Sequence, residues 1–241
     1  MKIALIGYGK MGREIERIAR DRGHEIVATI DMHEEEKFHS DEFKSADVAI
    51  EFTSPASAFQ NYMHAFEAGV PVVSGTTGWL DRIDQIKEAC EKEGKTFFYA
   101  SNFSLGVNLF FALNNYLAGL MNRFTDYDAR IEETHHIHKL DAPSGTAITL
   151  AEGILERVER KKEWSLDKKE ADTLHIESFR EGEVPGIHTV VYESPVDSIR
   201  LTHDAKSREG FALGAVLAAE FTKGKKGFLG MEDLLNLQAT P

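Results

Sequence analysis

The sequence has 241 residues, of which 42% are apolar and 28% are charged, a composition typical of a globular protein with a sizeable core. Its formal net charge of −12 repels nucleic acid and anionic membranes, so local groups must hold any anionic ligand. One cysteine, Cys90, excludes an internal disulfide, and no apolar run is long enough to span a bilayer. We therefore expect a cytoplasmic protein, with Cys90 as a structural thiol in an acidic helix.

The N-terminal residues predict a nucleotide site. A short apolar strand, residues 2–6, leads into the glycine loop Gly7-Tyr8-Gly9-Lys10-Met11-Gly12, then into a helical pattern and a second strand that ends at Asp31. This order matches the dinucleotide-binding fingerprint, in which the three glycines permit a tight turn, close approach to a pyrophosphate and close helix packing, and the acid bonds the ribose. The alternative is an ordinary glycine turn in an α/β domain.

Three more apolar strands alternate with helices up to residue 105, after a polar stretch, 33–46, that we expect to be a surface connection. Such alternation predicts a parallel sheet with right-handed crossovers, whose strand ends meet at one edge. Taken singly, each strand end is an ordinary turn, but together they predict a ligand-binding edge. The residues at these ends are Phe52, Thr53, Gly75, Thr76, Thr77, Ser101, Asn102 and Phe103.

From residue 106 the pattern changes to a long helix, a histidine-rich segment, a helix to about residue 162 with a solvated lysine-rich end, and short alternating strands. The predicted fold class is α/β: a Rossmann-type doubly wound parallel sheet, followed by a second α+β domain on a mixed or antiparallel sheet. We assign residues 1–105 and 216–241 to the first domain and 106–215 to the second. The tail is too short to fold alone and should dock on the first domain.

The histidine-rich segment, EETHHIHKLDAPSGT at 132–146, predicts an anion site. Ser144 is placed to cap a helix, and Gly145 and Thr146 would leave N–H groups unpaired in its first turn, which favours a carboxylate or phosphate. If the residues before it are extended, His135 and Lys139 share one face. The segment then forms a carboxylate pocket that holds a proton donor.

Two other interpretations of this segment remain. Its histidines suggest a metal site, but His-x-His on a strand supplies only two ligands where zinc usually takes three or four, so we expect no metal. A solvated loop without chemistry explains the charges but not the Ser-Gly-Thr ending.

Beyond these patterns, HHIHKLDAPSGTA at 135–147 resembles the signature of the 4-hydroxy-tetrahydrodipicolinate reductase (dihydrodipicolinate reductase) family, which acts in the diaminopimelate route to lysine. The resemblance extends over nearly the whole chain. It includes the glycine loop and the stretches EFTSPAS (51–57), SGTTG (74–78), SNFSLGVN (101–108), FREGEVPGIH (179–188) and HDAKSREGFALGAVLAAEF (203–221).

The resemblance implies a reductase that uses NADH or NADPH on a cyclic dicarboxylate, with the cofactor on the first domain, the substrate on the second and reaction on closure between them. It implies His135 as general acid, Lys139 as a second proton donor, and substrate carboxylate contacts from His136, Lys139, Ser144, Gly145 and Thr146. Thr53, Gly75, Thr77, Asn102 and Phe103 match positions that line the nicotinamide. It also implies a homotetramer assembled through the sheet of the second domain.

Two departures from the family pattern bear on the cofactor. The glycine loop is one residue shorter than usual, and no arginine follows Asp31. An unbalanced carboxylate there repels a 2′-phosphate, although Lys10 or a protonated His33 would offset it, so we expect NADH to serve at least as well as NADPH. The open alternatives are a two-domain amino acid or imine dehydrogenase and a non-catalytic NAD sensor.

Overall fold

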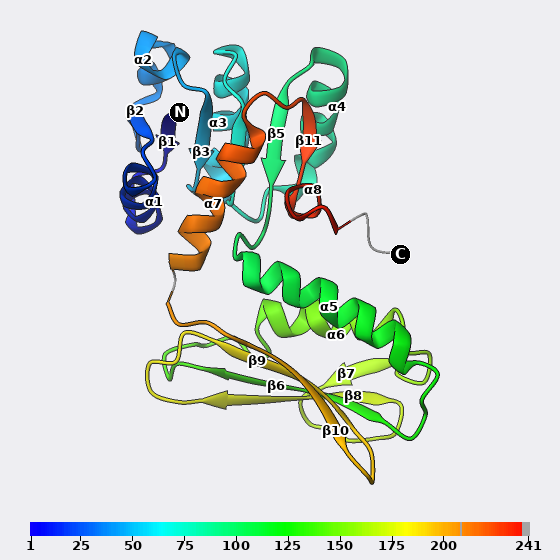
Figure 1. The fold of residues 1–241 in the computed structure, drawn as a ribbon. Helices are drawn as coiled ribbons and strands as arrows, with labels where there is room; N and C mark the ends of the chain where they lie inside the picture. Colours follow the sequence, from blue (N-terminus) through cyan, green and yellow to red (C-terminus); the bar gives the residue numbers. More distant parts are fainter. Residues whose placement is uncertain (208, 238–241) are drawn as a thin grey trace. The chain divides into compact units, whose positions relative to one another are not determined.

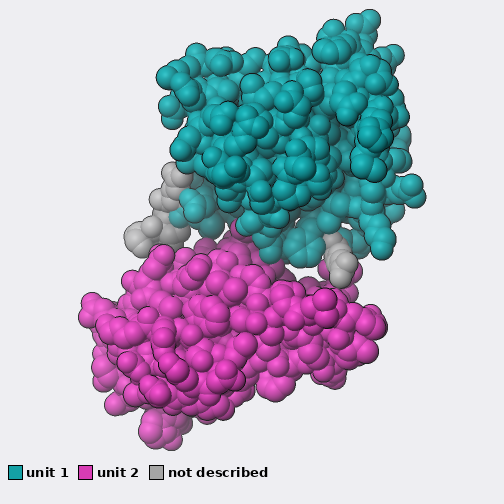
Figure 2. Space-filling model, turned by 180° about the vertical axis from the view of Figure 1, so that it is seen from behind, with its two compact units in different colours: residues 1–105, 209–241 teal, residues 106–208 magenta. Residues whose placement is uncertain are grey.

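The protein divides into two compact units in its computed structural model, which describes residues 1–207 and 209–237 (Figures 1 and 2). Unit 1 contains Met1–Leu105 and Glu209–Pro241, and unit 2 contains Gly106–Arg208. The chain thus returns to unit 1 at residue 209, seven residues before the boundary expected at 216. The reason is helix α7, Glu209–Thr222, which is continuous and buries Ala212, Ala215 and Val216 in the core of unit 1.

Unit 1 is built on a parallel sheet of six strands in the order β11-β5-β4-β3-β1-β2. The strands are β1 (Lys2–Ile6), β2 (Glu25–Ile30), β3 (Val48–Glu51), β4 (Val72–Ser74), β5 (Thr96–Tyr99) and β11 (Gly227–Leu229). The helices are α1 (Lys10–Asp21), α2 (Asp41–Lys44), α3 (Pro55–Glu67), α4 (Ile83–Glu93), α7 and α8 (Met231–Leu235), with 3-10 turns at Glu35–His39 and Leu80–Arg82. The Rossmann-type sheet expected from the sequence is therefore present.

Burial on both faces explains why these strands read as nearly unbroken apolar runs. One core packs against α3 and α4 and the other against α1 and α7, through residues such as Ile6 and Val72 on one side and Leu5 and Val73 on the other. The stretch 33–46 differs from the surface connection that we expected. Phe38 and Phe43 within it are buried in the first core, because the 3-10 turn and α2 direct both rings inward.

The C-terminal segment completes unit 1. Strand β11 pairs in parallel with β5, and Met231 at the start of α8 is buried in the second core. Cys90 lies in α4, where burial raises the pKa of its thiol to about 11 and keeps it protonated near neutral pH. None of the helices in residues 1–207 and 209–237 combines the length and apolarity that a membrane span needs.

Unit 2 is a mixed sheet covered on one face by two helices (Figure 1). The strand order is β10-β9-β6-β8-β7, in which β6 pairs antiparallel with β9 and parallel with β8. The strands are β6 (Asp128–His135), β7 (Glu163–Ser165), β8 (Thr173–Arg180), β9 (Ile187–Glu193) and β10 (Ser198–Asp204), and the helices are α5 (Leu105–Met121) and α6 (Gly145–Leu155). The core lies between α5, α6 and the sheet.

Helix α6 is shorter than predicted. It ends at Leu155 rather than near residue 162, and the chain turns so that the ammonium of Lys161 donates to the carbonyl oxygens of Ala171 and Thr173. Lys161 is 2% exposed and also pairs with Asp128. The lysine-rich end is therefore partly buried, because backbone acceptors just before β8 and at its first residue satisfy the ammonium of Lys161.

Candidate active site

The glycine loop between β1 and α1 is shaped by close backbone contacts. Gly7 has a φ of +91°, and a Cβ placed there would lie 2.1 Å from the carbonyl oxygen of Phe52. A Cβ at Gly12 would lie 2.2 Å from the carbonyl oxygen of Gly7, whereas Gly9 has open space around it. Helix α1 begins at Lys10, and its N-cap, Gly9, has no side chain to accept hydrogen bonds from the first N–H groups, which suits an anion at the helix start.

An open cleft of about 340 Å³ lies beside this loop in unit 1. Three strand ends supply its lining, from the connections after β1, β3 and β4, as expected for the carboxyl edge of a parallel sheet. The lining residues are Gly9, Lys10, Met11, Gly12, Phe52, Thr53, Pro55, Gly75, Thr76 and Thr77. Apart from Pro55, all belong to the predicted cofactor set.

The other predicted cofactor residues lie outside this lining. Ser101, Asn102 and Phe103 follow β5; Phe103 is buried and its ring packs 5.6 Å from that of Phe52. Asp31 follows β2 and is exposed, and its backbone N–H donates to the carboxylate of Glu34. Two carboxylates therefore stand at the end of β2, since Glu34 joins Asp31.

A buried carboxylate that was not predicted from the sequence holds two of the three threonines that line the cleft. Glu51, the last residue of β3, is fully buried, and its carboxylate accepts hydrogen bonds from the hydroxyls of Thr53, Ser74 and Thr76. Burial raises the pKa of Glu51, and these hydrogen bonds oppose the rise. Glu51 thus joins the connections after β3 and β4, a role that its place in a short apolar strand did not reveal.

The histidine-rich segment lies in unit 2, where its geometry differs from the extended one considered above. Strand β6 ends at His135, and a turn follows in which the N–H of Lys139 donates to the carbonyl oxygen of His136. The expectation that His135 and Lys139 share one face of an extended segment was therefore wrong, because only His135 belongs to the strand and Lys139 lies in the turn. His136 is half-buried, and His138 is exposed and pairs with Glu183.

His135 is buried at the end of β6, with 6% of its surface exposed. Its Nδ1 lies 3.7 Å from Oε2 of Glu133, and its ring packs edge-on against His188 with centroids 5.0 Å apart. Burial is the main cause that lowers the pKa of His135 to about 4; His188, Lys139 and Arg180 act in the same direction, and Glu133 opposes them. The imidazole is therefore neutral near pH 7.

The loop from 136 to 144 is held by charged side chains. The ammonium of Lys139 pairs with Asp141, with Nζ 2.8 Å from Oδ2. The guanidinium of Arg180, on β8, donates to the carbonyl oxygens of Lys139 and Asp141. Arg180 was not predicted as a site residue, although it lies in FREGEVPGIH (179–188), one of the stretches that resemble the family.

Helix α6 begins where the sequence predicted. Ser144 is the N-cap, and its Oγ accepts a hydrogen bond from the N–H of Ala147. No described residue accepts a hydrogen bond from the N–H groups of Gly145 or Thr146, and a Cβ at Gly145 would meet open space. The helix start is thus an available anion site, because free N–H donors and the helix dipole both favour negative charge.

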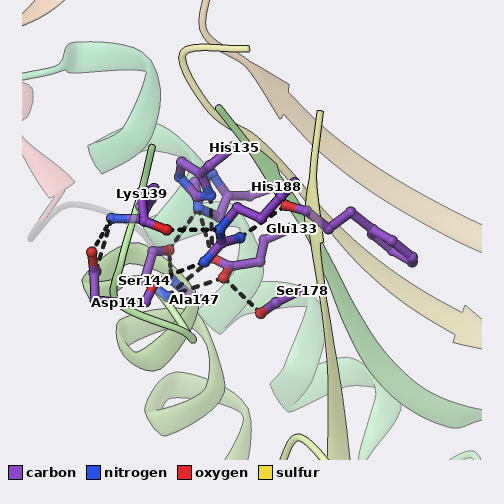
Figure 3. A network of polar contacts seen from close by, with 10 residues as sticks. Glu133, His135, Lys139, Asp141, Ser144, Ala147, Ser178 and His188 are labelled. Carbon is purple, nitrogen blue, oxygen red and sulfur yellow. Dashed lines mark hydrogen bonds and ion pairs between the residues drawn. The ribbon is translucent and has the colours of Figure 1, made fainter. Parts of the chain in front are cut away.

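Glu133, Ser178 and His188 were also missed, and Figure 3 shows them around Ser144 and His135. Register brings them together: Glu133 on β6 is the cross-strand partner of Ser178 on β8 and of His188 on β9. Ligand atoms of Glu133, His135 and His188 lie within 4.8 Å of one another, a spacing compatible with a metal. The carboxylate, however, already accepts hydrogen bonds from Ser144 and Ser178, which favours a hydrogen-bond network.

Comparison with known proteins identifies the family. The model for "Dihydrodipicolinate reductase, N-terminus" matches residues 1–103, and that for "Dihydrodipicolinate reductase, C-terminus" matches residues 106–235. A 4-hydroxy-tetrahydrodipicolinate reductase of Christiangramia forsetii is 53% identical over 236 residues, 98% of each chain. One from Archaeoglobus fulgidus is 37% identical over 98% of this chain and 100% of its own.

A solved structure has the same fold. The dipicolinate-bound dihydrodipicolinate reductase from Paenisporosarcina sp. TG-14 superposes with a TM-score of 0.80 at 23% identity, covering 97% of this chain and 98% of its own. The chain therefore belongs to the dihydrodipicolinate reductase family and is an oxidoreductase with a Rossmann-type unit, of a family that uses a nicotinamide cofactor.

Proposed function

We propose that the chain performs its family's reaction, the conversion of 4-hydroxy-tetrahydrodipicolinate to tetrahydrodipicolinate. The hydroxyl leaves as water, and the unsaturated ring that results is reduced by hydride from a nicotinamide cofactor, with His135 as general acid and Lys139 as second proton donor. One observation carries the proposal: a buried imidazole and an ammonium lie beside a helix start with unused N–H donors. That combination suits a small dicarboxylate that must be protonated as it accepts a hydride.

The substrate's carboxylates are bound by the N–H groups of Gly145 and Thr146 at the start of α6, by Ser144 and by the side chains of His136 and Lys139. Helix N-termini attract anions through free donors and the helix dipole. The net charge of −12 makes these local cations necessary, because the protein as a whole repels a dianion. The relative from Paenisporosarcina sp. with bound dipicolinate supports a ligand of this class.

His135 becomes the acid only when substrate is bound. In the free protein its pKa of about 4 leaves it neutral near pH 7, mainly because it is buried. A dianion bound beside it favours the charged imidazole, since an opposite charge within a few ångströms raises the pKa of histidine. The proton is therefore acquired together with the substrate and is delivered to the atom next to the carbon that accepts the hydride, where the electron pair of the reduced double bond is left.

The cofactor is bound by unit 1, at the cleft beside the glycine loop and along the adjacent strand ends. We propose that NADH serves at least as well as NADPH. Asp31 and Glu34 both place carboxylates at the end of β2, where the adenosine ribose of a dinucleotide lies in this fold, and both repel a 2′-phosphate. Lys37 does not offset Asp31, because its ammonium pairs with Glu34.

A cytoplasmic location, a homotetramer and the assignment of cofactor and substrate to units 1 and 2 stay predictions. Light scattering coupled to size-exclusion chromatography tests the tetramer. Variants at Gly7 and His135 test in the intact chain whether the cofactor binds unit 1 and the substrate binds unit 2.

A coupled assay tests the reaction. The preceding synthase, fed with pyruvate and aspartate semialdehyde, supplies the substrate, and loss of NADH absorbance reports turnover. We expect turnover and competitive inhibition by pyridine-2,6-dicarboxylate. Turnover of an amino acid or imine substrate without such inhibition would support the dehydrogenase alternative instead, and cofactor binding with no turnover would support the NAD sensor.

A further inference from the structure

Glu133 is a buried carboxylate to which the proposed chemistry assigns no task. It precedes His135 by two residues on β6, so both side chains point to the helix-covered face of the sheet. Only 1% of its surface is exposed. A buried charge is costly unless its partners compensate it, so its contacts indicate what it does.

The first set of contacts fixes the start of α6. Both carboxylate oxygens accept a hydrogen bond from the backbone N–H of Ser144, each at 3.1 Å, and Oε1 accepts one from the hydroxyl of Ser178 at 2.7 Å (Figure 3). Ser144 is the N-cap that precedes the free N–H groups of Gly145 and Thr146. Glu133 therefore sets the position of the backbone that forms the anion site.

The second set of contacts places negative charge between two imidazoles. Oε2 lies 3.7 Å from Nδ1 of His135 and 3.6 Å from Nε2 of His188, and Nε2 of His188 is also 3.0 Å from the hydroxyl of Ser144. Burial by itself raises the pKa of Glu133, but His188, Ser144 and Ser178 lower it to about 2, so the group is ionised near neutral pH.

The other groups around His135 act against its protonation. His188 faces it from β9, Lys139 from the loop after β6 and Arg180 from β8, and each lowers its pKa. Nδ1 of His135 is buried and has no hydrogen-bond partner among the residues that the structure describes. The carboxylate of Glu133 lies within 4 Å of that nitrogen and is the negative group that raises the pKa of His135.

We propose that Glu133 is a positioning residue of the reaction: it holds Ser144 at the anion site and stabilises the imidazolium form of His135 once substrate is bound. The inference rests on the proposed role of His135 as general acid. Binding closes the 3.7 Å gap enough for Nδ1–H to donate to Oε2, so that Nε2 faces the substrate with the transferable proton.

Glu133→Gln tests the charge at nearly constant shape, because the amide oxygen still accepts from Ser144 and Ser178. A carboxylate beside histidine raises its pKa, so its removal moves the basic limb of the kcat–pH profile down by about one unit or more. At pH 7.5 we expect kcat to fall at least tenfold, with a much smaller change in the Kd for pyridine-2,6-dicarboxylate. Glu133→Asp, which keeps the charge, should retain the wild-type limb to within a few tenths of a unit.

Glu132→Gln is the matched control, because it removes the same charge one residue away on the opposite face of β6, where Glu132 pairs with Arg130 and Arg200. Its profile should coincide with that of the wild type. If the basic limb of the kcat–pH profile of Glu133→Gln lies at the same pH as that of the wild type, the proposal is overturned. Should that variant not fold by circular dichroism, imidazole ¹⁵N shifts of wild-type protein with pyridine-2,6-dicarboxylate decide: a protonated Nδ1 on His135 supports it and an unprotonated Nδ1 overturns it.

His135→Gln separates this inference from the proposed function. If that variant keeps full activity, the assignment of His135 itself fails. If it loses activity while Glu133→Gln keeps the wild-type rate and profile, only the role of Glu133 fails.

Discussion

Lys139 and Asp141 form an ion pair in which Nζ lies 2.8 Å from Oδ2, although Asp141 is largely exposed and Lys139 is half-buried. The pair holds the ammonium at one side of the loop that leads to α6. It also keeps the carboxylate of Asp141 next to the proposed anion site. That carboxylate would repel an anionic substrate if Lys139 did not neutralise it. The substrate therefore competes with Asp141 for the ammonium.

Lys139→Ala should lower kcat and raise KM for the substrate by about 10- to 100-fold, because a charge-assisted hydrogen bond contributes about 1.5–3 kcal/mol. It also leaves Asp141 unbalanced. The double variant Lys139→Ala/Asp141→Asn should recover part of KM but none of kcat. Steady-state kinetics of both variants check this, and an unchanged KM in Lys139→Ala would remove the residue from the substrate site.

Gly7→Ala should weaken cofactor binding at least tenfold, since its Cβ would meet the carbonyl oxygen of Phe52 and displace the glycine loop. Gly23→Ala is the matched control. Gly23 also has a positive φ, +81°, so it shares the backbone strain, but a Cβ there has open space. Fluorescence titration with NADH should separate the two, and equal losses of affinity would count against the loop as the cofactor site.

Asp31→Ser should raise the ratio of kcat/KM for NADPH to that for NADH by about tenfold or more, because removing one of two carboxylates relieves repulsion of the 2′-phosphate. In the wild type we expect the ratio to be near or below one. A wild-type preference for NADPH of more than about tenfold, worth about 1.4 kcal/mol, would contradict the proposed cofactor choice.

Acid should destabilise the protein in two steps. His135 has a pKa of about 4 when folded and about 6.5 when unfolded, so the unfolded chain binds more protons between these values and stability is lost as pH falls from 6.5 to 4. Glu133 has a pKa of about 2 when folded against an ordinary value near 4.5, so the stability continues to fall below pH 4.5. The Tm of His135→Gln should change less than that of the wild type between pH 6.5 and 4, and parallel curves would contradict the buried neutral imidazole.

Local rules predicted much of this protein. The tight turn at Gly7, the close packing at Gly12 and the cap at Ser144 each depend on a few neighbouring residues, and the structure has all three. The inward packing of Phe38 and Phe43 was missed, because a polar stretch gave no periodicity on which to place two isolated rings.

The network around Glu133 could not be read from the sequence. It depends on strand register, which pairs Glu133 with Ser178 and His188, residues far along the chain, and pairs His135 with Arg180. The turn after His135 likewise depends on Arg180, which binds the carbonyl oxygens of Lys139 and Asp141. Isolated histidines and glutamates in alternating strands carry no local signal of such partners.

The most direct measurement is the turnover of His135→Gln in the coupled assay, with NADH binding measured on the same protein. The account predicts a kcat lower by roughly 10² to 10⁴, the usual contribution of a general acid, with NADH affinity unchanged because the residue lies in unit 2. A kcat within a factor of about two of the wild type would contradict the proposal that this imidazole delivers the proton.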